Sequence, residues 1–521
     1  MRRFRAIGYQ LSAISGLLAP AGSAQSAPFH VEETSIAAIH AAMRAGRLSC
    51  RALVEKYLRR IDAYDKRGPA INALVVVNPA ARAVADSLDR RYRSERRFVG
   101  PLHCIPMIVK DNFETVELPT TAGSLSLKGY VSSRDAFQVR RIREAGAIML
   151  AKSNMAEFAF SPYETVNSIL PGYTRNPYAL DRVTAGSSGG TAAAVAGNLG
   201  EVGLGTDTGN SIRGPSAHNA LVGIRSTMGL TSRAGIVPLN LAADIAGPMA
   251  RSVADAAAVF QVIVGEDPDD SVTARSHGRA PVDYTAALRK DGLEGARIGV
   301  LHQAYDTPSA DAEVLQVFGK ALTELRKAGA LVIDSVAVDS LDSWRRAQSG
   351  SCAPFKWDLN AWLAQQDAKV PVKSLDEIIK SRRFHPSIEQ RLVSSQAADV
   401  APEQNPGCRS RDEFRAKLRA GVLRLMDSLQ LDALAYPTWS NPPRLIGDLN
   451  TPAGDNSQLF SPSTGYPALT VPMGYTREGV LPAGLQLLGR PWSEATLIRL
   501  AYAYEQATHH RHPPKNLPPL P

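Results

Sequence analysis

Metal-ligand clusters and long apolar runs are what this sequence lacks, and their absence excludes several classes of protein. Its four cysteines form no C-x-x-C pair. Its ten histidines form no ligand-spaced pair outside the terminal segment HHRH, which we interpret as a solvated helix end. We therefore expect no metal site and no cofactor. No stretch after residue 27 is apolar enough for a transmembrane helix, so we expect no stable membrane insertion.

A strong excess of charge of one sign is absent too. The 59 basic and 50 acidic residues are interleaved, so the net charge of +9 is spread over 521 residues. The densest basic run, RRYRSERR at residues 90–97, has no ladder of aromatic residues and follows a helical pattern. We interpret it as a solvated helix end, and we expect no nucleic-acid partner.

The cysteines are few and widely spaced, at Cys50, Cys104, Cys352 and Cys408. In an oxidising compartment Cys352 and Cys408 could pair, and their spacing does not decide between a disulfide and two thiols. We expect buried free thiols.

The first 27 residues differ from the rest of the chain. They run MRRFRAIGYQLSAISGLLAPAGSAQSA, with a basic start, a modest apolar middle and small residues suited to cleavage near Ala24 or Ala27. This order is typical of a secretory signal peptide. We predict a signal peptide over residues 1–27, one domain over residues 28–521, and a periplasmic or secreted protein. Without the signal the protein would be cytoplasmic.

Short apolar runs alternate with helical periodicity through the chain. We expect helices between Thr34 and about Arg93, a strand that ends at Lys110–Asn112, and irregular structure over residues 340–410. Further strands are expected in AIMLAKSN, ARIGVL, ALVIDSVAV, LDALAYPTW, PALTVPMGY and AGLQLLG, and a last helix in SEATLIRLAYAYEQATHH. This alternation indicates an α/β sandwich of one domain.

Two serine–glycine clusters lie in TAGSSGGTAAAVAGNLGEVGLGTDTGNSIRGPS, residues 184–216. Reading Gly186–Gly190 as G-x-S-x-G would make Ser188 the nucleophile of an α/β-hydrolase. The preceding NPYALDRVTA is rich in turn residues rather than a buried strand, and the late histidines lie in the terminal helix and tail. A phosphate loop would need Lys-Ser or Lys-Thr after the last glycine, where the chain has Thr191 and Ala192. The clusters match neither pattern well.

A third interpretation uses both clusters together with a lysine. Burial lowers the pKa of a lysine, so a neutral lysine can act as a base. A serine hydroxyl both donates and accepts hydrogen bonds, so it can relay a proton between that lysine and a second serine. The sequence supplies Lys110 in IPMIVKDN, Ser187 in AGSSGG and Ser211 in DTGNSIRGP. This chemistry needs no histidine.

The same segments resemble the amidase signature family. GPLHCIPMIVKDN is similar to that family's catalytic-lysine strand, and TTAGS follows it at residues 120–124. LAKSNMAEFAF, RNPYALDRVTAGSSGGTAAAVA and GLGTDTGNSIRGPSAHNALVGIRSTMG resemble the signature core. TGYPALTVPMGY and LPAGLQLLGRPWSEATLIRLAYAYE resemble the C-terminal part. The resemblance extends from about Thr34 to Gln506 and is least constrained over residues 340–450.

The resemblance implies a fold and a role for individual residues. The fold is a single large α/β/α sandwich, with a mixed central β-sheet flanked by helices. The triad is the nucleophile Ser211, the relay Ser187 after a cis peptide bond, and the base Lys110. The other implied roles are an oxyanion hole from the backbone N–H groups of Thr208, Gly209, Asn210 and Ser211, a supporting shell of Ser188, Asp207 and Arg213, and substrate contact by Met155 and Ser187. For Met155, core packing is the alternative.

Two positions depart from the family pattern. Asn210 stands where a second glycine is common before the nucleophile, and Ala185 replaces a common glycine before Gly186. Asparagine tolerates a left-handed backbone better than most residues, so we expect the turn to survive at Asn210. Neither change removes a catalytic group.

The resemblance implies an amidase that hydrolyses a carbon–nitrogen amide bond through an acyl-enzyme, with a small-molecule amide and water as partners. The alternatives are hydrolysis of esters, carbamates or urea derivatives on the same triad, and the amidase subunit of an amidotransferase, which releases ammonia from glutamine. A non-catalytic scaffold would lack the lysine or a serine, and none is missing. The sequence does not decide whether the protein forms a homodimer. The aromatic residues of the variable region either line a pocket or pack a helix onto the core: Trp344, Phe355, Trp357 and Trp362.

Overall fold

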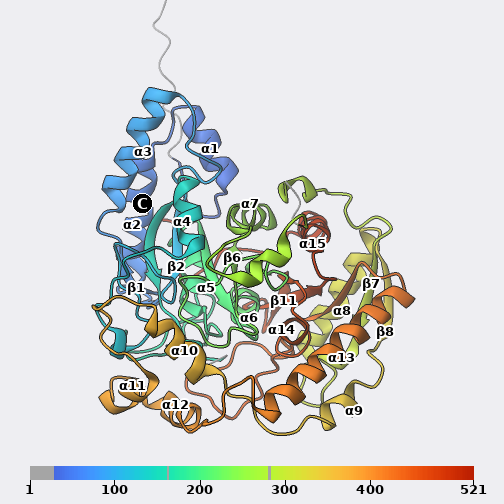
Figure 1. The fold of residues 1–521 in the computed structure, drawn as a ribbon. Helices are drawn as coiled ribbons and strands as arrows, with labels where there is room; N and C mark the ends of the chain where they lie inside the picture. Colours follow the sequence, from blue (N-terminus) through green and yellow to red (C-terminus); the bar gives the residue numbers. More distant parts are fainter. Residues whose placement is uncertain (1–28, 161–162, 280–282, 521) are drawn as a thin grey trace, which may run out of the picture.

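A single mixed β-sheet runs through the molecule (Figure 1). The computed structural model describes residues 29–160, 163–279 and 283–520. In these ranges the sheet has 11 strands in the order β1-β3-β2-β4-β6-β5-β10-β11-β9-β7-β8. The strands are β1 Leu74–Val77, β2 Pro106–Lys110, β3 Ile148–Ser153, β4 Val202–Asp207, β5 Val222–Arg225, β6 Ile245–Ala250, β7 Arg297–Leu301, β8 Leu331–Val336, β9 Ala433–Pro437, β10 Ala468–Thr476 and β11 Leu481–Leu488.

The sheet combines parallel and antiparallel pairs. β2 runs parallel to both β3 and β4, and β7 runs parallel to both β8 and β9. The remaining neighbouring strands pair antiparallel. This arrangement confirms the expected α/β fold with a mixed central sheet flanked by helices.

Helices connect the strands and cover the sheet (Figure 1). They are α1 Ile36–Arg44, α2 Cys50–Tyr64, α3 Ala81–Glu95, α4 Phe137–Glu144, α5 Gly189–Ala196, α6 Arg213–His218, α7 Val253–Ile263, α8 Ala312–Lys327, α9 Leu341–Arg346, α10 Phe355–Ala364, α11 Leu375–Ser381, α12 Glu389–Gln396, α13 Pro406–Ser428, α14 Phe460–Thr464 and α15 Glu494–Thr508. Short 3-10 helices lie at Leu125–Leu127, Glu157–Ala159, Ser271–Ser276, Thr285–Ala287, His302–Ala304 and Pro386–Ile388.

Two expectations about local structure are wrong. Residues 340–410 are not irregular, because α9 to α12 and the start of α13 lie there. Each of α9 to α12 is too short to show a long apolar period in the sequence. The helical pattern expected from Thr34 to Arg93 is interrupted by β1, whose four residues LVVV pair antiparallel with β3.

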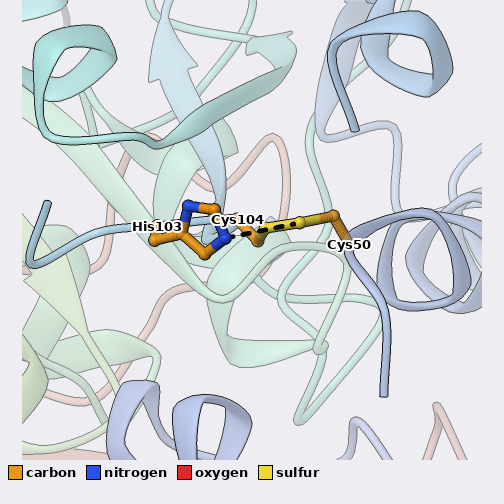
Figure 2. A group of neighbouring side chains, drawn as sticks. All are labelled: Cys50, His103 and Cys104. Atoms are coloured by element: carbon orange, nitrogen blue, oxygen red, sulfur yellow. Dashed lines mark hydrogen bonds between the residues drawn. A yellow bond between two sulfur atoms is a disulfide. The ribbon is translucent and has the colours of Figure 1, made fainter. Parts of the chain in front are cut away.

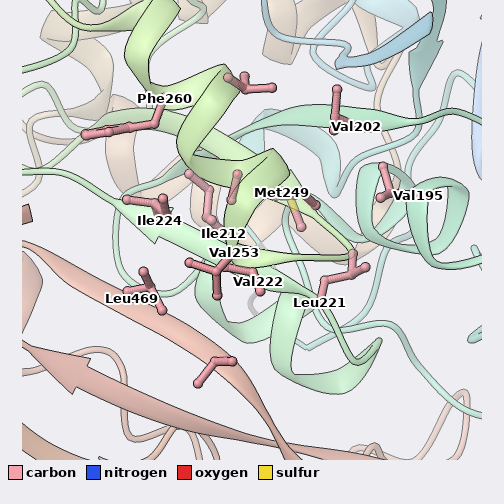
Figure 3. Packing of buried hydrophobic residues seen from close by; sticks show 14 of the residues in the cluster. Val195, Val202, Ile212, Leu221, Val222, Ile224, Met249, Val253, Phe260 and Leu469 are labelled. Atoms are coloured by element: carbon pink, nitrogen blue, oxygen red, sulfur yellow. The ribbon is translucent and has the colours of Figure 1, made fainter. Parts of the chain in front are cut away.

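The main hydrophobic core lies between the sheet and the helices packed on it. Figure 3 shows Val253 and Phe260 of α7 gathered with Ile224 of β5, Met249 of β6 and Leu469 of β10. All of these side chains are at most 2 % exposed. Burial of such side chains contributes about 1.5–3 kcal/mol each, which holds the central strands rigidly in place.

A second hydrophobic cluster lies under α10, α11 and α12, which Figure 1 shows together at one end of the molecule. Phe355 and Trp362 of α10 pack there with Leu375 of α11 and Leu392 of α12. Phe355 also makes edge contacts with the rings of Phe158 and Phe160. Most of the variable aromatic residues therefore serve packing, and Trp344 likewise packs against the main core.

The expectation of free thiols is wrong, because all four cysteines are paired within the described residues. Cys50, the first residue of α2, is bonded to Cys104 beside His103 (Figure 2). Cys352 is bonded to Cys408 near the start of α13. The Cα atoms lie 5.2 Å and 4.7 Å apart, within the range that a disulfide requires. The sequence offered the Cys352–Cys408 pair as one alternative, whereas the pairing of Cys50 with Cys104 was not anticipated.

The predicted signal peptide over residues 1–27 lies outside the described residues. Among the helices that the structure describes, none has the length and apolar character needed to cross a bilayer.

Candidate active site

Lys110 is the last residue of β2 and is completely buried. Its Nζ donates hydrogen bonds of 2.7 Å to the Oγ of Ser187 and of 2.7 Å to the Oγ1 of Thr206. Because β2 and β4 run parallel, their carboxyl ends meet at one edge of the sheet, which brings Thr206 next to Lys110. These two hydrogen bonds hold the lysine amine on two sides.

Burial lowers the pKa of Lys110 to about 7, because an ammonium is costly in a water-free site. The carboxylates of Asp207 and Asp244 oppose this shift by stabilising the charged form. A lysine with this pKa is neutral in a substantial fraction of molecules at neutral pH, so it can accept a proton.

Ser187 lies in the loop before α5, and the peptide bond between Gly186 and Ser187 is cis. The Ser187 carbonyl accepts a hydrogen bond of 3.1 Å from the N–H of Ala156. Gly190 has the backbone of Asn154 so close that any Cβ would collide with it. The lack of a side chain at Gly190 therefore lets α5 begin in direct contact with the backbone of Asn154.

Ala185 adopts a positive φ of 58°, in the left-handed region. Ala185 replaces a glycine that is common in the family. In the left-handed region of φ a residue with a Cβ strains the backbone. At Asn210, the other departure, the turn between β4 and α6 is present, but it does not use a left-handed residue. Neither Gly209 nor Asn210 is among the residues with positive φ, so the turn there requires no left-handed residue.

Ser211 lies in the turn between β4 and α6, and its residue is 5 % exposed. Its Oγ donates a hydrogen bond of 3.4 Å to the Oδ1 of Asn210. Within the described part of the chain, no hydrogen bond links Ser187 directly to Ser211. The structure therefore joins Lys110 to Ser187 and places Ser211 on the adjoining loop, with its hydroxyl turned to Asn210.

A buried ionic cluster fixes this loop. Asp207 accepts hydrogen bonds from the backbone N–H groups of Ile212 at 3.1 Å and Arg213 at 3.3 Å. Its carboxylate also pairs with the guanidinium groups of Arg213 and Arg225. Burial opposes the charge, but the two guanidiniums prevail and hold the pKa of Asp207 at about 2. Arg213 in turn donates a hydrogen bond of 2.6 Å to the carbonyl of Gly209.

The remaining predicted residues occupy different places. Ser188 Oγ donates to the carbonyl of Thr206 and accepts from its N–H, so it ties the loop to β4. Thr208 Oγ1 donates a hydrogen bond of 2.6 Å to Asp244. Met155 is completely buried in the second hydrophobic cluster and is not among the residues that line the cavity described next.

A cavity of about 430 Å³ opens in front of Ser211. The loop 208–211 forms part of its wall, and Phe355 and Cys352 lie on another part. Arg391 and Arg415 supply the charged groups of the lining. The volume suits a small ligand, and the lining mixes apolar and polar groups as ligand sites usually do.

Sequence reasoning missed three residues that the site uses. Thr206 holds Lys110, Arg225 shares the charge of Asp207, and Arg415 lines the cavity. Thr206 and Arg225 both lie within GLGTDTGNSIRGPSAHNALVGIRSTMG, so the motif contained them without distinguishing them from their neighbours. Arg415 had no sequence signal, because it lies in the least constrained region.

Comparison with known proteins identifies the family. A family model described as Amidase matches residues 52–498. The chain belongs to the amidase signature family. Members of this family are hydrolases of carbon–nitrogen bonds, and this amidase shares that general activity.

The relatives of this amidase span nearly its whole length. It is 33% identical over 510 residues to an Arabidopsis thaliana protein named "Probable amidase", covering 94% of this chain and 93% of that protein. It is 34% identical over 496 residues to a glutamyl-tRNA(Gln) amidotransferase subunit of Halorhodospira halophila, covering 92% of this chain and 98% of that one. The crystal structure of peptide amidase from Stenotrophomonas maltophilia matches with a TM-score of 0.83 and 39% identity, over 93% of this chain and 98% of that one.

Proposed function

We propose that this amidase hydrolyses linear carboxamides with Ser211 as nucleophile, Ser187 as proton relay and Lys110 as base. The observation that carries this proposal is the 2.7 Å hydrogen bond between the buried Lys110 Nζ and the Ser187 Oγ. Lys110 has a pKa lowered to about 7 and a hydrogen bond to a buried serine. A lysine with a purely structural role would need neither feature, whereas a general base needs both.

In the first half of the reaction, Ser211 Oγ attacks the amide carbon while its proton passes to Ser187, and the Ser187 proton passes to neutral Lys110. The tetrahedral intermediate then expels the amine, which takes a proton back along the same route. In the second half, water attacks the acyl-enzyme with the roles reversed, which releases the carboxylic acid and regenerates Ser211.

The negative charge of the intermediate needs hydrogen-bond donors. The backbone N–H groups of Gly209 and Ser211 have no acceptor among the described residues, and both residues line the cavity. We assign the oxyanion hole to the turn 208–211. Removing one such donor typically costs about 3–4 kcal/mol of transition-state stabilisation.

The proton route requires one movement. Ser211 Oγ is hydrogen-bonded to Asn210 and has to turn toward Ser187 when the substrate carbonyl enters. Catalytic hydrogen bonds are often long or misaligned without substrate and tighten in the complex. The Asp207 cluster keeps the backbone still while the side chain turns, because Arg213 and the N–H of Ile212 anchor both ends of the loop.

Residues 1–27 support the further proposal that the protein is exported. Two disulfides within the described residues agree with an oxidising compartment. An exported enzyme has no access to tRNA-dependent amidation, so we favour a free amidase over a component of an amidotransferase. Sequencing the N-terminus of the protein recovered from a periplasmic fraction tests this: a chain that begins after Ala24 or Ala27 supports export, and an intact Met1 in the cytoplasm contradicts it.

Active-site labelling tests the proposed function. A fluorophosphonate should label the wild-type protein, with the adduct on Ser211 in peptide mass spectrometry. Ser211→Ala and Lys110→Ala should each abolish ammonia release from primary amides, while both proteins keep the circular dichroism spectrum of the wild type. Wild-type rates in purified Ser211→Ala would exclude this nucleophile. A screen that includes esters, carbamates and urea derivatives separates the alternatives for the scissile bond.

A further inference from the structure

Arg415 is a half-buried cation with one long ionic contact, and it lines the same cavity as Ser211. It lies on α13, and its side chain is 12% exposed. Its one ionic contact within the described ranges is to Asp412 at 3.6 Å, and that carboxylate is 61% exposed and already contacts Arg411. None of the hydrogen bonds found among the described residues uses the Arg415 guanidinium. Arginine offers five donors, so the Arg415 guanidinium has donors left for a ligand.

Arg415 lines two neighbouring cavities. The cavity in front of Ser211 and a neighbouring cavity of about 480 Å³ are both lined by Arg415, Pro462 and Ser463. The second cavity also carries Arg275 and Arg419 on its wall. Arg415 is therefore shared by the two cavities, whereas Ser211 lines only the first, so a molecule that reaches from Ser211 into the second cavity would pass Arg415.

No carboxylate of the described residues lines either cavity, although both contain arginines. Arg391, which also lines the first cavity, donates to the Phe160 carbonyl and stacks on the Phe160 ring. Burial, together with the nearby cations Arg411 and Arg419, lowers the pKa of Arg415 to about 10, so the group stays charged at neutral pH. A half-buried charge whose single ion pair is 3.6 Å long is only partly compensated, and a carboxylate of a bound ligand would supply the missing opposite charge.

We infer that Arg415 is a specificity-determining residue that binds a carboxylate of the substrate, so that the preferred substrates are amides carrying a carboxylate at a distance from the scissile bond. This inference rests on the proposed function, because it names the substrate class of that same site. The Arg415 guanidinium makes no hydrogen bond within the described residues beyond its long contact to Asp412, and a guanidinium fork matches one carboxylate in a bidentate pair. The preferred class is then the monoamides of dicarboxylic acids and related acidic amides.

Pairs of substrates that differ only in one carboxylate measure the contribution of that negative charge to kcat/KM. The monoamides of butanedioic through octanedioic acid are compared with the corresponding diamides, in which a neutral carboxamide replaces the carboxylate at nearly the same size. Ammonia release gives kcat/KM for each. We expect the best monoamide to exceed its diamide by about tenfold or more, because a charge-assisted pair is lost in the diamide. Equal values for wild type across the whole series would overturn the inference.

Variants assign the effect to Arg415. Arg415→Gln should lower kcat/KM for the monoamide by about tenfold or more, chiefly through KM, and should leave the diamide within about twofold. Arg415→Lys should restore part of the preference. Arg424→Gln is the matched control, since Arg424 is an exposed arginine on the same helix and outside both cavities, and it should behave as wild type. A variant that loses both substrates equally shows a structural role and contradicts the proposal.

A binding measurement separates this inference from the proposed function. Calorimetric titration of Ser211→Ala with the monoamides should show binding that disappears in Ser211→Ala/Arg415→Gln. If the wild type cleaves no amide, the proposed function fails, and this titration still decides the carboxylate site. Absence of binding to the single variant, or equal binding to both variants, would refute the site. Binding of inorganic phosphate with no binding of any monoamide would also refute a carboxylate site.

Discussion

The Nζ of Lys110 donates a hydrogen bond of 2.7 Å to Thr206 Oγ1 on the adjacent strand β4. The same oxygen accepts a hydrogen bond of 3.1 Å from Asn112 Nδ2. With its oxygen committed to these donors, Thr206 orients the lysine so that Ser187 lies on another side of the amine. The nitrogen of neutral Lys110 can then present its lone pair to the Ser187 hydroxyl.

Replacing Thr206 tests whether this residue positions the amine of Lys110. We expect Thr206→Val to lower kcat by about tenfold, because a misplaced base transfers protons less efficiently. The mutation removes an acceptor that favours the ammonium form, so the acidic limb of the rate profile should move to lower pH. Thr206→Ser keeps the hydroxyl, so it should have the kcat and the pH profile of the wild type. An unchanged pH profile in Thr206→Val would show that the threonine does not act on Lys110.

The rate of amide hydrolysis should depend on pH through Lys110. The base is active when neutral, and its pKa is about 7. We therefore expect kcat/KM to rise as the pH increases through about 7 and to level off above it. Below that pH the ammonium form predominates and activity falls about tenfold per unit. Stopped assays in overlapping buffers at constant ionic strength measure this, and a flat profile down to pH 5 would contradict a lysine base.

The same group should leave a signature in stability. Its pKa is lower in the folded state than in an unfolded chain, so the unfolded state binds more protons between these two pKa values. The free energy of unfolding of the wild type, relative to Lys110→Met, should therefore increase as the pH rises from about 7 toward 10. The slope should approach about 1.4 kcal/mol per unit. Urea unfolding at several pH values measures it, and parallel curves for the two proteins would contradict the shift.

The two disulfides should differ in their effect on catalysis. Cys352 lines the cavity, whereas Cys50 and Cys104 do not. Removing either pair by double serine substitution should cost about 2–5 kcal/mol of stability. Loss of the Cys352–Cys408 bond should also lower kcat/KM by about tenfold, mainly through KM, because the cavity wall loses its anchor to α13. The Cys50→Ser/Cys104→Ser protein is the control and should keep the wild-type KM. Equal kinetic effects of the two pairs would refute this role.

Ala185→Gly should stabilise the protein. The positive φ of Ala185 strains a residue that has a Cβ, and glycine relieves the strain at the cost of a more flexible unfolded chain. We expect a net gain of about 0.5–1 kcal/mol in the free energy of unfolding. The control Ala194→Gly, within α5, should lower it by about 1 kcal/mol. Destabilisation by Ala185→Gly would show that the Cβ makes a packing contact worth more than the strain.

Most elements of the fold were predictable where several apolar residues follow one another. The strand ending at Lys110, the strand around Ile148–Ser153 and the last helix lie within two residues of their expected places. β1 was missed because four residues are too few to show a period. The helices α10 to α12 were missed because their apolar faces are complete only when they pack together in the second cluster, and α9, whose Leu341 packs in the main core, is only six residues long.

Within the site, the sequence supplied the lysine and the two serines that indicate amide hydrolysis. The contacts between these residues form only when the chain folds. Lys110 and Ser187 are 77 residues apart in sequence and share a hydrogen bond only because β2 ends beside the loop before α5. The direction of the Ser211 hydroxyl, the role of Thr206 and the pairing of cysteines depend on such contacts, and no spacing along the chain encodes them.

By itself, the sequence determined the family of this protein and the lysine and two serines of its proposed triad, because those residues sit in continuous motifs whose order is set by the chain. Tertiary structure alone decided the environment of those groups: a lysine whose pKa falls because strands bury it, and an arginine from a variable helix brought beside the cavity. Burial and the approach of distant charges depend on where the whole chain packs, so they exist only once it has folded.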